Sequence, residues 1–194
     1  MVHTRFLFVW LIAVALGTAV CAGDADDRVS FKQENRPDNL KALFELVHHK
    51  IHVERDTKQA LALVRSLIPD EARVKPALRD GLAPEMLSQI ADQHQKMREM
   101  REAEVAKLAR PTQKVVQVHA ASTEGIARYQ EGSVASREFP GGAKRLAEQV
   151  LRPGVTFYEV EFLEPGKDAG MKYHLLYWDG QQWSMLGALW RVLK

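Results

Sequence analysis

Apolar residues recur at helical spacing through the first half of the chain. The first series recurs at i, i+3, i+4, i+7 and i+11, and consists of Leu40, Leu43, Phe44, Val47 and Ile51. That spacing is typical of one face of an α-helix. Proline and acidic residues are favoured in a first helical turn, and Pro37 and Asp38 precede the series. The pattern therefore predicts a helix from residue 37 to about Val53.

Three further helical segments are predicted before residue 111. Asp56 and Gln59 have the spacing of a capping box at the start of the second helix, whose apolar face is Leu61, Val64, Leu67 and Ile68. A short piece follows Pro69, and a longer helix begins at Pro84 and ends before Pro111. His94 lies in the apolar stripe of that longer helix, which favours a buried, hydrogen-bonded histidine over a metal ligand.

The pattern changes after Pro111. "KVVQVHA" alternates like a strand, and two short helices follow it, one closed by Gly132 and one entered through Gly141 and Gly142. The glycine pair, followed by two basic residues, could hold an anion on free N–H groups, but helix entry explains it more simply. The last forty residues read as three antiparallel strands. The chain is thus predicted to be α+β, with N-terminal helices packed on a C-terminal curved antiparallel sheet.

The strongest hairpin signal is Asp179-Gly180, between two runs rich in aromatic residues. If these two residues alone form the turn, period-two alternation places one set of side chains on a common face of the sheet, with Tyr173 on the other. We take that set as the predicted ligand pocket: His174, Leu176, Trp178, Trp183 and Met185.

The N-terminus has the features of an export signal. Arg5 precedes an uncharged run from Phe6 to Val20, and cleavage after Ala22 would make residues 1–22 a signal peptide. Lipid attachment at Cys21 is the alternative, although "TAVC" departs from the usual lipoprotein pattern. Residues 23–36 are expected to be a flexible tether, and residues 37–194 a single domain with a helical part (37–110) and a sheet-rich part (112–194). The chain is then exported, periplasmic or extracellular, with no stable membrane span after cleavage.

Composition excludes several classes of function. The single cysteine, Cys21, leaves the domain without disulfides, thiolate zinc ligands or a cysteine nucleophile. A formal net charge of +2 without a basic stripe argues against nucleic-acid binding. No cofactor motif is recognised.

The histidine-rich stretch "FELVHHKIHVE" contains a possible metal site. On a helix, Glu45, His48 and His52 share one side, whereas His49 points elsewhere. Zinc would suit the two imidazoles, but a further ligand from another element would be needed. A solvated helix flank is the alternative interpretation.

The order of elements, helices followed by a strand and a meander ending in "YHLLYWDGQQWSMLG", resembles the nuclear transport factor 2-like (SnoaL-like) superfamily. The resemblance implies a curved sheet that wraps helices into a cone, whose mouth holds a small ligand or is closed by a partner subunit. No position matches the catalytic acid–base pairs of that superfamily, so the resemblance carries no activity over.

Three classes of function follow. The first is a non-catalytic exported module that binds a small apolar molecule or a protein partner, with a homodimer as one possibility. The second is a small-molecule enzyme of isomerase, dehydratase or hydrolase type, in which His174 is the general base and Tyr158 or Tyr173 a polarising donor. The third is a metal-binding protein that uses the side chains of the histidine-rich stretch.

Overall fold

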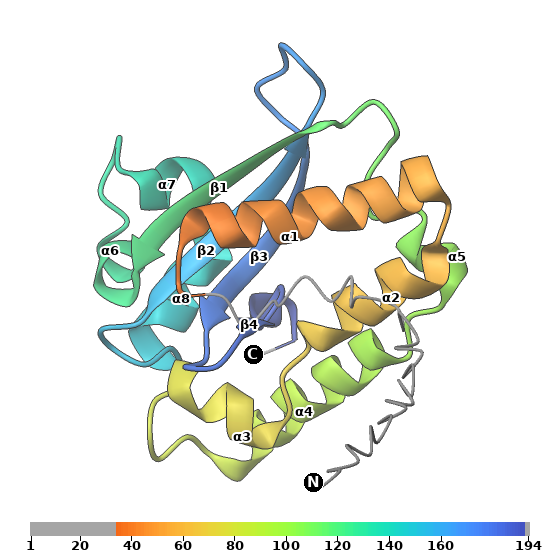
Figure 1. The fold of residues 1–194 in the computed structure, drawn as a ribbon. Coiled ribbons are helices and arrows are strands. Elements are labelled where there is room, and N and C mark those ends of the chain that lie inside the picture. Colours follow the sequence, from red (N-terminus) through yellow and green to blue (C-terminus); the bar gives the residue numbers. More distant parts are fainter. Residues whose placement is uncertain (1–33, 193–194) are drawn as a thin grey trace, which may run out of the picture.

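The fold is described for residues 34–192, from a computed structural model of the chain. The predicted signal peptide and the predicted tether up to residue 33 lie outside these residues. Helices occupy the N-terminal half and a four-stranded antiparallel sheet the C-terminal half, which confirms the α+β class (Figure 1).

The first two helices follow the sequence pattern closely. Helix α1 (Pro37–His49) continues as a π-helical turn (Lys50–Glu54) and stops at Arg55, which has a left-handed φ of 58°. Helix α2 (Thr57–Ser66) begins where Asp56 accepts a hydrogen bond of 2.9 Å from the N–H of Gln59. Both helices bury the apolar faces that their spacing predicted.

The predicted long helix from Pro84 is interrupted. After α3 (Glu71–Val74) and a 3-10 turn (Lys75–Ala77), α4 runs over Pro84–Arg98 and a separate α5 over Glu102–Val105. A new N-terminus forms at Arg101, whose N–H donates to Glu104, and the freed carbonyl of Met100 accepts from Arg65. These tertiary and capping bonds replace the continuous helix that the periodicity indicated.

The sheet has the strand order β1-β2-β3-β4. Its strands are β1 (Val115–Ser122), β2 (Thr156–Leu163), β3 (Met171–Trp178) and β4 (Trp183–Met185). Helices α6 (Thr123–Arg128), α7 (Val134–Glu138) and α8 (Gly141–Gln149) connect β1 to β2, and a 3-10 turn (Leu189–Arg191) follows β4.

The final hairpin differs from a two-residue turn. Trp178 pairs with Trp183 and Leu176 with Met185, so four residues, 179–182, form the connection. The buried Asp179 carboxylate holds this wider connection. It accepts hydrogen bonds from the N–H groups of Gln181 and Gln182, and it also pairs with Arg73. A tight turn at Asp179-Gly180 would not satisfy these bonds.

A β-bulge in β3 also changes which residues share a face. His174 and Leu175 both lie opposite Glu159, between the pairs Tyr158–Leu176 and Val160–Tyr173, and Leu175 has a φ of 54°. A bulge adds one residue to a strand and shifts the alternation of everything before it. Tyr173 therefore lies on the face of Leu176, and His174 on the other, the reverse of simple alternation.

Helices cover the two faces of the sheet (Figure 1). One apolar cluster joins α1 and α2 to the first face, which includes Tyr158, Val160 and Phe162. A second cluster joins α6, α8 and the C-terminal 3-10 turn to the other face, through Phe157 and Tyr177. The chain thus builds a separate core on each side of the sheet.

Candidate functional site

A cavity of about 620 Å³ lies between α3 and α4. Its floor is apolar and contains Val74, Leu78 and Ile90, while His94 reaches it from the middle of α4. Helices α3 and α4 form the two sides of the cavity. The short connection between them bends at residues 78–83, and this bend leaves the space open. The volume is within the range of about 300–1,000 Å³ that small-molecule sites occupy.

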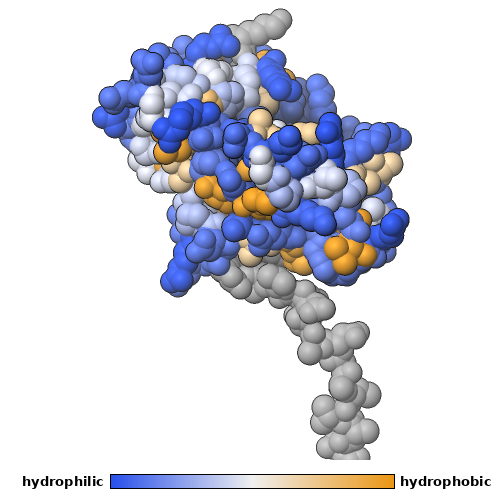
Figure 2. Space-filling view, turned by 90° about the horizontal axis from the view of Figure 1, so that it is seen from above, coloured by the Kyte–Doolittle hydropathy of each residue, from blue (hydrophilic) through white to orange (hydrophobic). Residues whose placement is uncertain are grey.

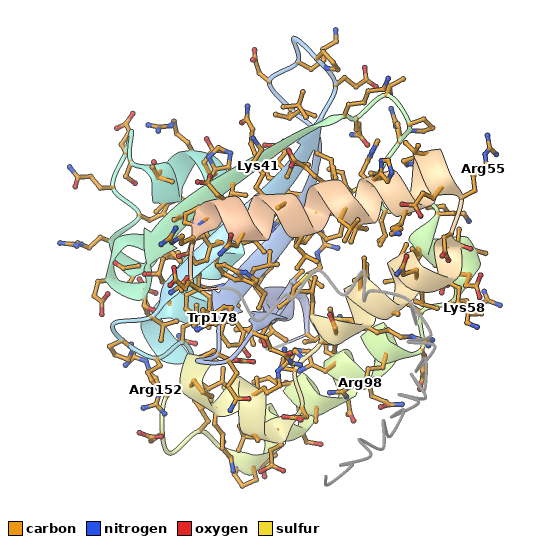
Figure 3. All side chains as sticks on the ribbon, viewed as in Figure 1. Lys41, Arg55, Lys58, Arg98, Arg152 and Trp178 are labelled. Carbon is orange, nitrogen blue, oxygen red and sulfur yellow. The ribbon has the colours of Figure 1, made fainter. Side chains whose placement is uncertain are left out.

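The rim of this cavity carries both signs of charge. Basic side chains are Lys75, Arg79 and Arg98, and acidic ones are Asp70, Glu71 and Asp80. Arg98 donates to the carbonyl of Pro69 at 2.5 Å and Arg79 to the carbonyl of Leu151 at 3.0 Å. Asp80 pairs with Arg152, and Arg98 and Arg152 lie on either side of α3 in the view of Figure 3. The rim therefore favours a neutral or zwitterionic polar group over a single strong charge.

His94 is buried, as its position in the apolar stripe predicted. Its Nε2–H donates to the carbonyl of Leu186 at 3.4 Å. Burial lowers the pKa of His94 to about 4, which the hydrogen bond to Leu186 only partly opposes. At neutral pH the imidazole is uncharged and ties α4 to the end of the sheet.

Four of the five residues predicted to line a pocket in the final hairpin pack together in the first apolar cluster, and His174 lies elsewhere. Leu176, Trp183 and Met185 are buried in the first cluster, and Trp178 packs against it. The void beside Met185 measures about 10 Å³, roughly the least that holds one water molecule. The hairpin thus contributes its own aromatic side chains to the first cluster.

The two tyrosines predicted as polarising donors already have hydrogen-bond acceptors. Tyr158 donates to Oδ1 of Asn35 at 3.0 Å, and Tyr173 donates to the carbonyl of Leu108 at 2.5 Å. Burial raises the pKa of both hydroxyls. Each hydroxyl serves to attach a neighbouring segment to the sheet.

His174 lies apart from both tyrosines, on the second face. Its Nδ1 and Oε2 of Glu159 share a hydrogen bond of 2.5 Å, and its ring meets Trp190 edge to face at 5.0 Å. Burial raises the pKa of Glu159, although His174 and the N–H of Leu175 act in the opposite direction. This is an oriented histidine, but it does not line the cavity between α3 and α4.

Two histidines of the histidine-rich stretch contact the turn that precedes β1. Nε2 of His52 lies 2.9 Å from the carbonyl of Ala109, and Nε2 of His48 lies 3.3 Å from that of Arg110. Glu45 pairs with Lys41 at 3.8 Å. The side chains of His48 and His52 therefore hold the turn before β1, and the structure gives Glu45 a different partner.

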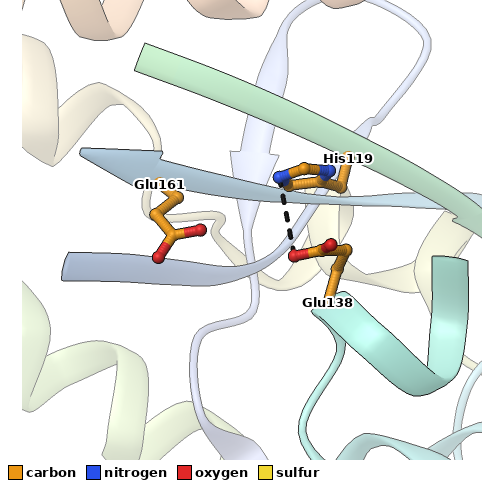
Figure 4. A group of neighbouring side chains, drawn as sticks. All are labelled: His119, Glu138 and Glu161. Carbon is orange, nitrogen blue, oxygen red and sulfur yellow. Dashed lines mark ion pairs between the residues drawn. The ribbon is translucent and has the colours of Figure 1, made fainter. Parts of the chain in front are cut away.

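A polar cluster on the second face of the sheet escaped the sequence pattern. His119 on β1, Glu138 at the end of α7 and Glu161 on β2 approach one another (Figure 4). Lys172 of β3 pairs with both glutamates. The alternation in "VVQVHA" and "FYEVEF" places His119 and Glu161 on one face of their strands. It could not show that α7 would bring Glu138 over that face.

Comparison with models of protein families, with curated proteins and with solved structures finds no match. The resemblance to the nuclear transport factor 2-like superfamily therefore stays a prediction. In the part of the chain that the structure describes, no helix has both the length and the apolar character needed to cross a bilayer.

Proposed function

We propose that this chain is an exported, non-catalytic module that binds a small amphipathic molecule in the cavity between α3 and α4. The cavity itself carries this proposal, because an opening of about 620 Å³ with an apolar floor would otherwise cost the domain packing. An apolar body would contact Val74, Leu78 and Ile90. A hydrogen-bonding end would lie at the mixed rim.

The surface supports a small ligand over a broad protein partner. The large apolar residues that are exposed among those described come from five different elements: Val53, Leu87, Val115, Val134 and Met171. Seen from above, the surface is mostly hydrophilic, with apolar residues in small separate areas (Figure 2). Leu87 lines the cavity, where an apolar ligand would cover it.

Binding is preferred over catalysis because the one histidine of the cavity is poorly suited to act as a general base. Burial lowers the pKa of His94 to about 4, so its imidazole is a weak base at neutral pH, whereas general-base catalysis favours a pKa near the working pH. His174, the oriented histidine, faces a different part of the molecule. The proposal also includes export, which is expected from the N-terminal sequence, and a homodimer, which the family resemblance offers as one possibility.

Filling the cavity tests the proposal. Ala91 lines the cavity from an exposed position on α4, so Ala91→Trp should occupy it without disturbing the core. The matched control is Gln89→Trp, which is exposed on the same helix and does not line the cavity. The probe is N-phenyl-1-naphthylamine, a small, neutral, largely apolar molecule with environment-sensitive fluorescence.

We expect Ala91→Trp to weaken probe binding at least tenfold and Gln89→Trp to leave it unchanged. Native mass spectrometry of protein purified from its own host should also show a retained small molecule, which Ala91→Trp loses. Equal probe binding by the two tryptophan variants would overturn the assignment of the site. Mass spectrometry of the N-terminus separates cleavage after Ala22 from lipidation at Cys21.

A further inference from the structure

Three potential metal ligands from three separate elements converge on the second face of the sheet. His119 comes from β1, Glu138 from α7 and Glu161 from β2, and one ligand atom of each lies within 4.8 Å of the others (Figure 4). The distance from Nε2 of His119 to Oε2 of Glu138 is 3.6 Å. Ligand atoms around a tetrahedral zinc ion, at bond lengths of about 2.0–2.1 Å, lie roughly 3.3 Å apart. Small side-chain movements would bring the three atoms to one ion.

Nε2 of His119 supplies an independent observation. It is buried and has no hydrogen-bond partner, because its approach to Glu138 is too long for a hydrogen bond. Buried ring nitrogens are rarely left without a partner, since the loss of hydration is then uncompensated. This nitrogen faces the carboxylate of Glu138, and in the tautomer with its proton on Nδ1 it would offer a lone pair to a cation bound there.

The Glu161 carboxylate is held in place for such a role. Its side chain is only 4% exposed, and Oε1 accepts a hydrogen bond of 2.7 Å from the N–H of Gly170. That approach depends on glycine, because a Cβ at residue 170 would lie 1.8 Å from the carbonyl oxygen of Phe162. Hydrogen bonds of this kind orient carboxylates that bind metals.

Lys172 competes for the same position. Its Nζ lies 2.9 Å from Oε2 of Glu138 and 3.4 Å from Oε2 of Glu161. One ammonium group thus faces two carboxylates. A divalent cation that displaces the flexible lysine would balance both.

We propose that His119, Glu138 and Glu161 form a site for a divalent transition-metal ion, with Lys172 as the cation that it displaces. One imidazole and two carboxylates suit Zn²⁺, and water would complete the coordination. The site is distinct from the cavity between α3 and α4 and from the stretch that contains His48 and His52.

Zinc titration of the full chain, after treatment with a chelator, tests this site. Calorimetry and thermal unfolding in the presence of ZnCl₂ should show one bound ion and a raised Tm. His119→Ala should weaken binding at least tenfold, and Glu138→Gln at least threefold. His49→Ala, in an exposed histidine, is the control and should bind as the wild type does.

Lys172→Met gives the sharper test, because misfolding cannot produce a gain. Removal of the competing ammonium should tighten zinc binding by threefold or more. No tightening would overturn the role of Lys172. Zinc binding that survives His119→Ala, but is lost in a His48→Ala and His52→Ala double variant, would move the site to the other histidines and overturn the proposal.

Discussion

The Glu159 carboxylate holds together the β-bulge of β3 through His174. Its Oε2 shares a hydrogen bond of 2.5 Å with Nδ1 of His174, and its Oε1 accepts the N–H of Leu175 at 3.2 Å. One buried side chain thus satisfies both residues of the bulge, which lie directly opposite it. The bulge in turn decides that Tyr173 faces α1 and that His174 does not.

Glu159→Ala should lower the free energy of unfolding by about 2–3 kcal/mol, because it leaves the N–H of Leu175 buried without an acceptor. Glu159→Gln should cost less, since its amide oxygen can still accept that N–H. Urea unfolding followed by tryptophan fluorescence measures both. Glu148→Ala, in an exposed helical ion pair, is the control, with a change below about 0.5 kcal/mol. A similarly small change for Glu159→Ala would contradict this role.

Gly142 should not tolerate a side chain. A Cβ at that position would lie 2.3 Å from the indole of Trp190, whereas a Cβ at Gly141 would meet nothing within 4 Å. Gly142→Ala should therefore lower stability by about 1–3 kcal/mol through overpacking. Gly141→Ala should be neutral or slightly stabilising, because alanine favours the helix. Thermal unfolding compares the pair, and equal Tm values would show that Trp190 yields freely.

His94 should make stability depend on pH. Its pKa is lowered from 6.5 to about 4 in the folded state, so only the unfolded state binds a proton between these values. Stability is full above pH 6.5 and falls as the pH decreases towards 4, by about 2 kcal/mol between pH 7 and pH 5. His94→Gln should lose this part of the pH dependence. Urea unfolding at several pH values tests it, and an unchanged slope would argue against a neutral His94.

Asp179 should be essential for the wide connection between β3 and β4. Its side chain is 2% exposed and pairs with Nε of Arg73 at 2.6 Å, while Ser184 donates to it at 2.8 Å. Asp179→Asn should cost about 3 kcal/mol, because Arg73 loses its buried countercharge. Ser184→Ala, which removes a single hydrogen bond, should cost about 1 kcal/mol. Equal costs would mean that charge contributes little here.

The ion pair between Asp179 and Arg73 should stabilise the fold less at low pH. Burial alone would raise the pKa of Asp179, but hydrogen bonds from Arg73, Gln182, Gln181 and Ser184 lower it below the usual 3.8. The stabilisation is present above pH 3.8 and is lost as the pH falls through the lower, folded-state value. The stability difference between the wild type and Asp179→Asn should therefore persist to about pH 4 and shrink below it.

The sequence by itself determined the class of fold and most of its elements. Helical periodicity predicted α1 and α2, and the cap at Asp56 marked the start of α2, because these signals depend on residues a few positions apart. Alternation predicted β1 and the final meander in the same way. The position of His94 within an apolar stripe predicted its burial.

Only the tertiary structure decided the sites. Bonds between distant residues, such as Arg73 to Asp179 and Glu159 to Leu175, set the hairpin loop and the bulge, and no local pattern encodes them. The bulge placed His174 on the face opposite Leu176, Trp178, Trp183 and Met185, which pack in the first cluster. The cavity beside α4 and the cluster around Glu161 arise where separate elements meet. Local sequence spacing therefore could not reveal them.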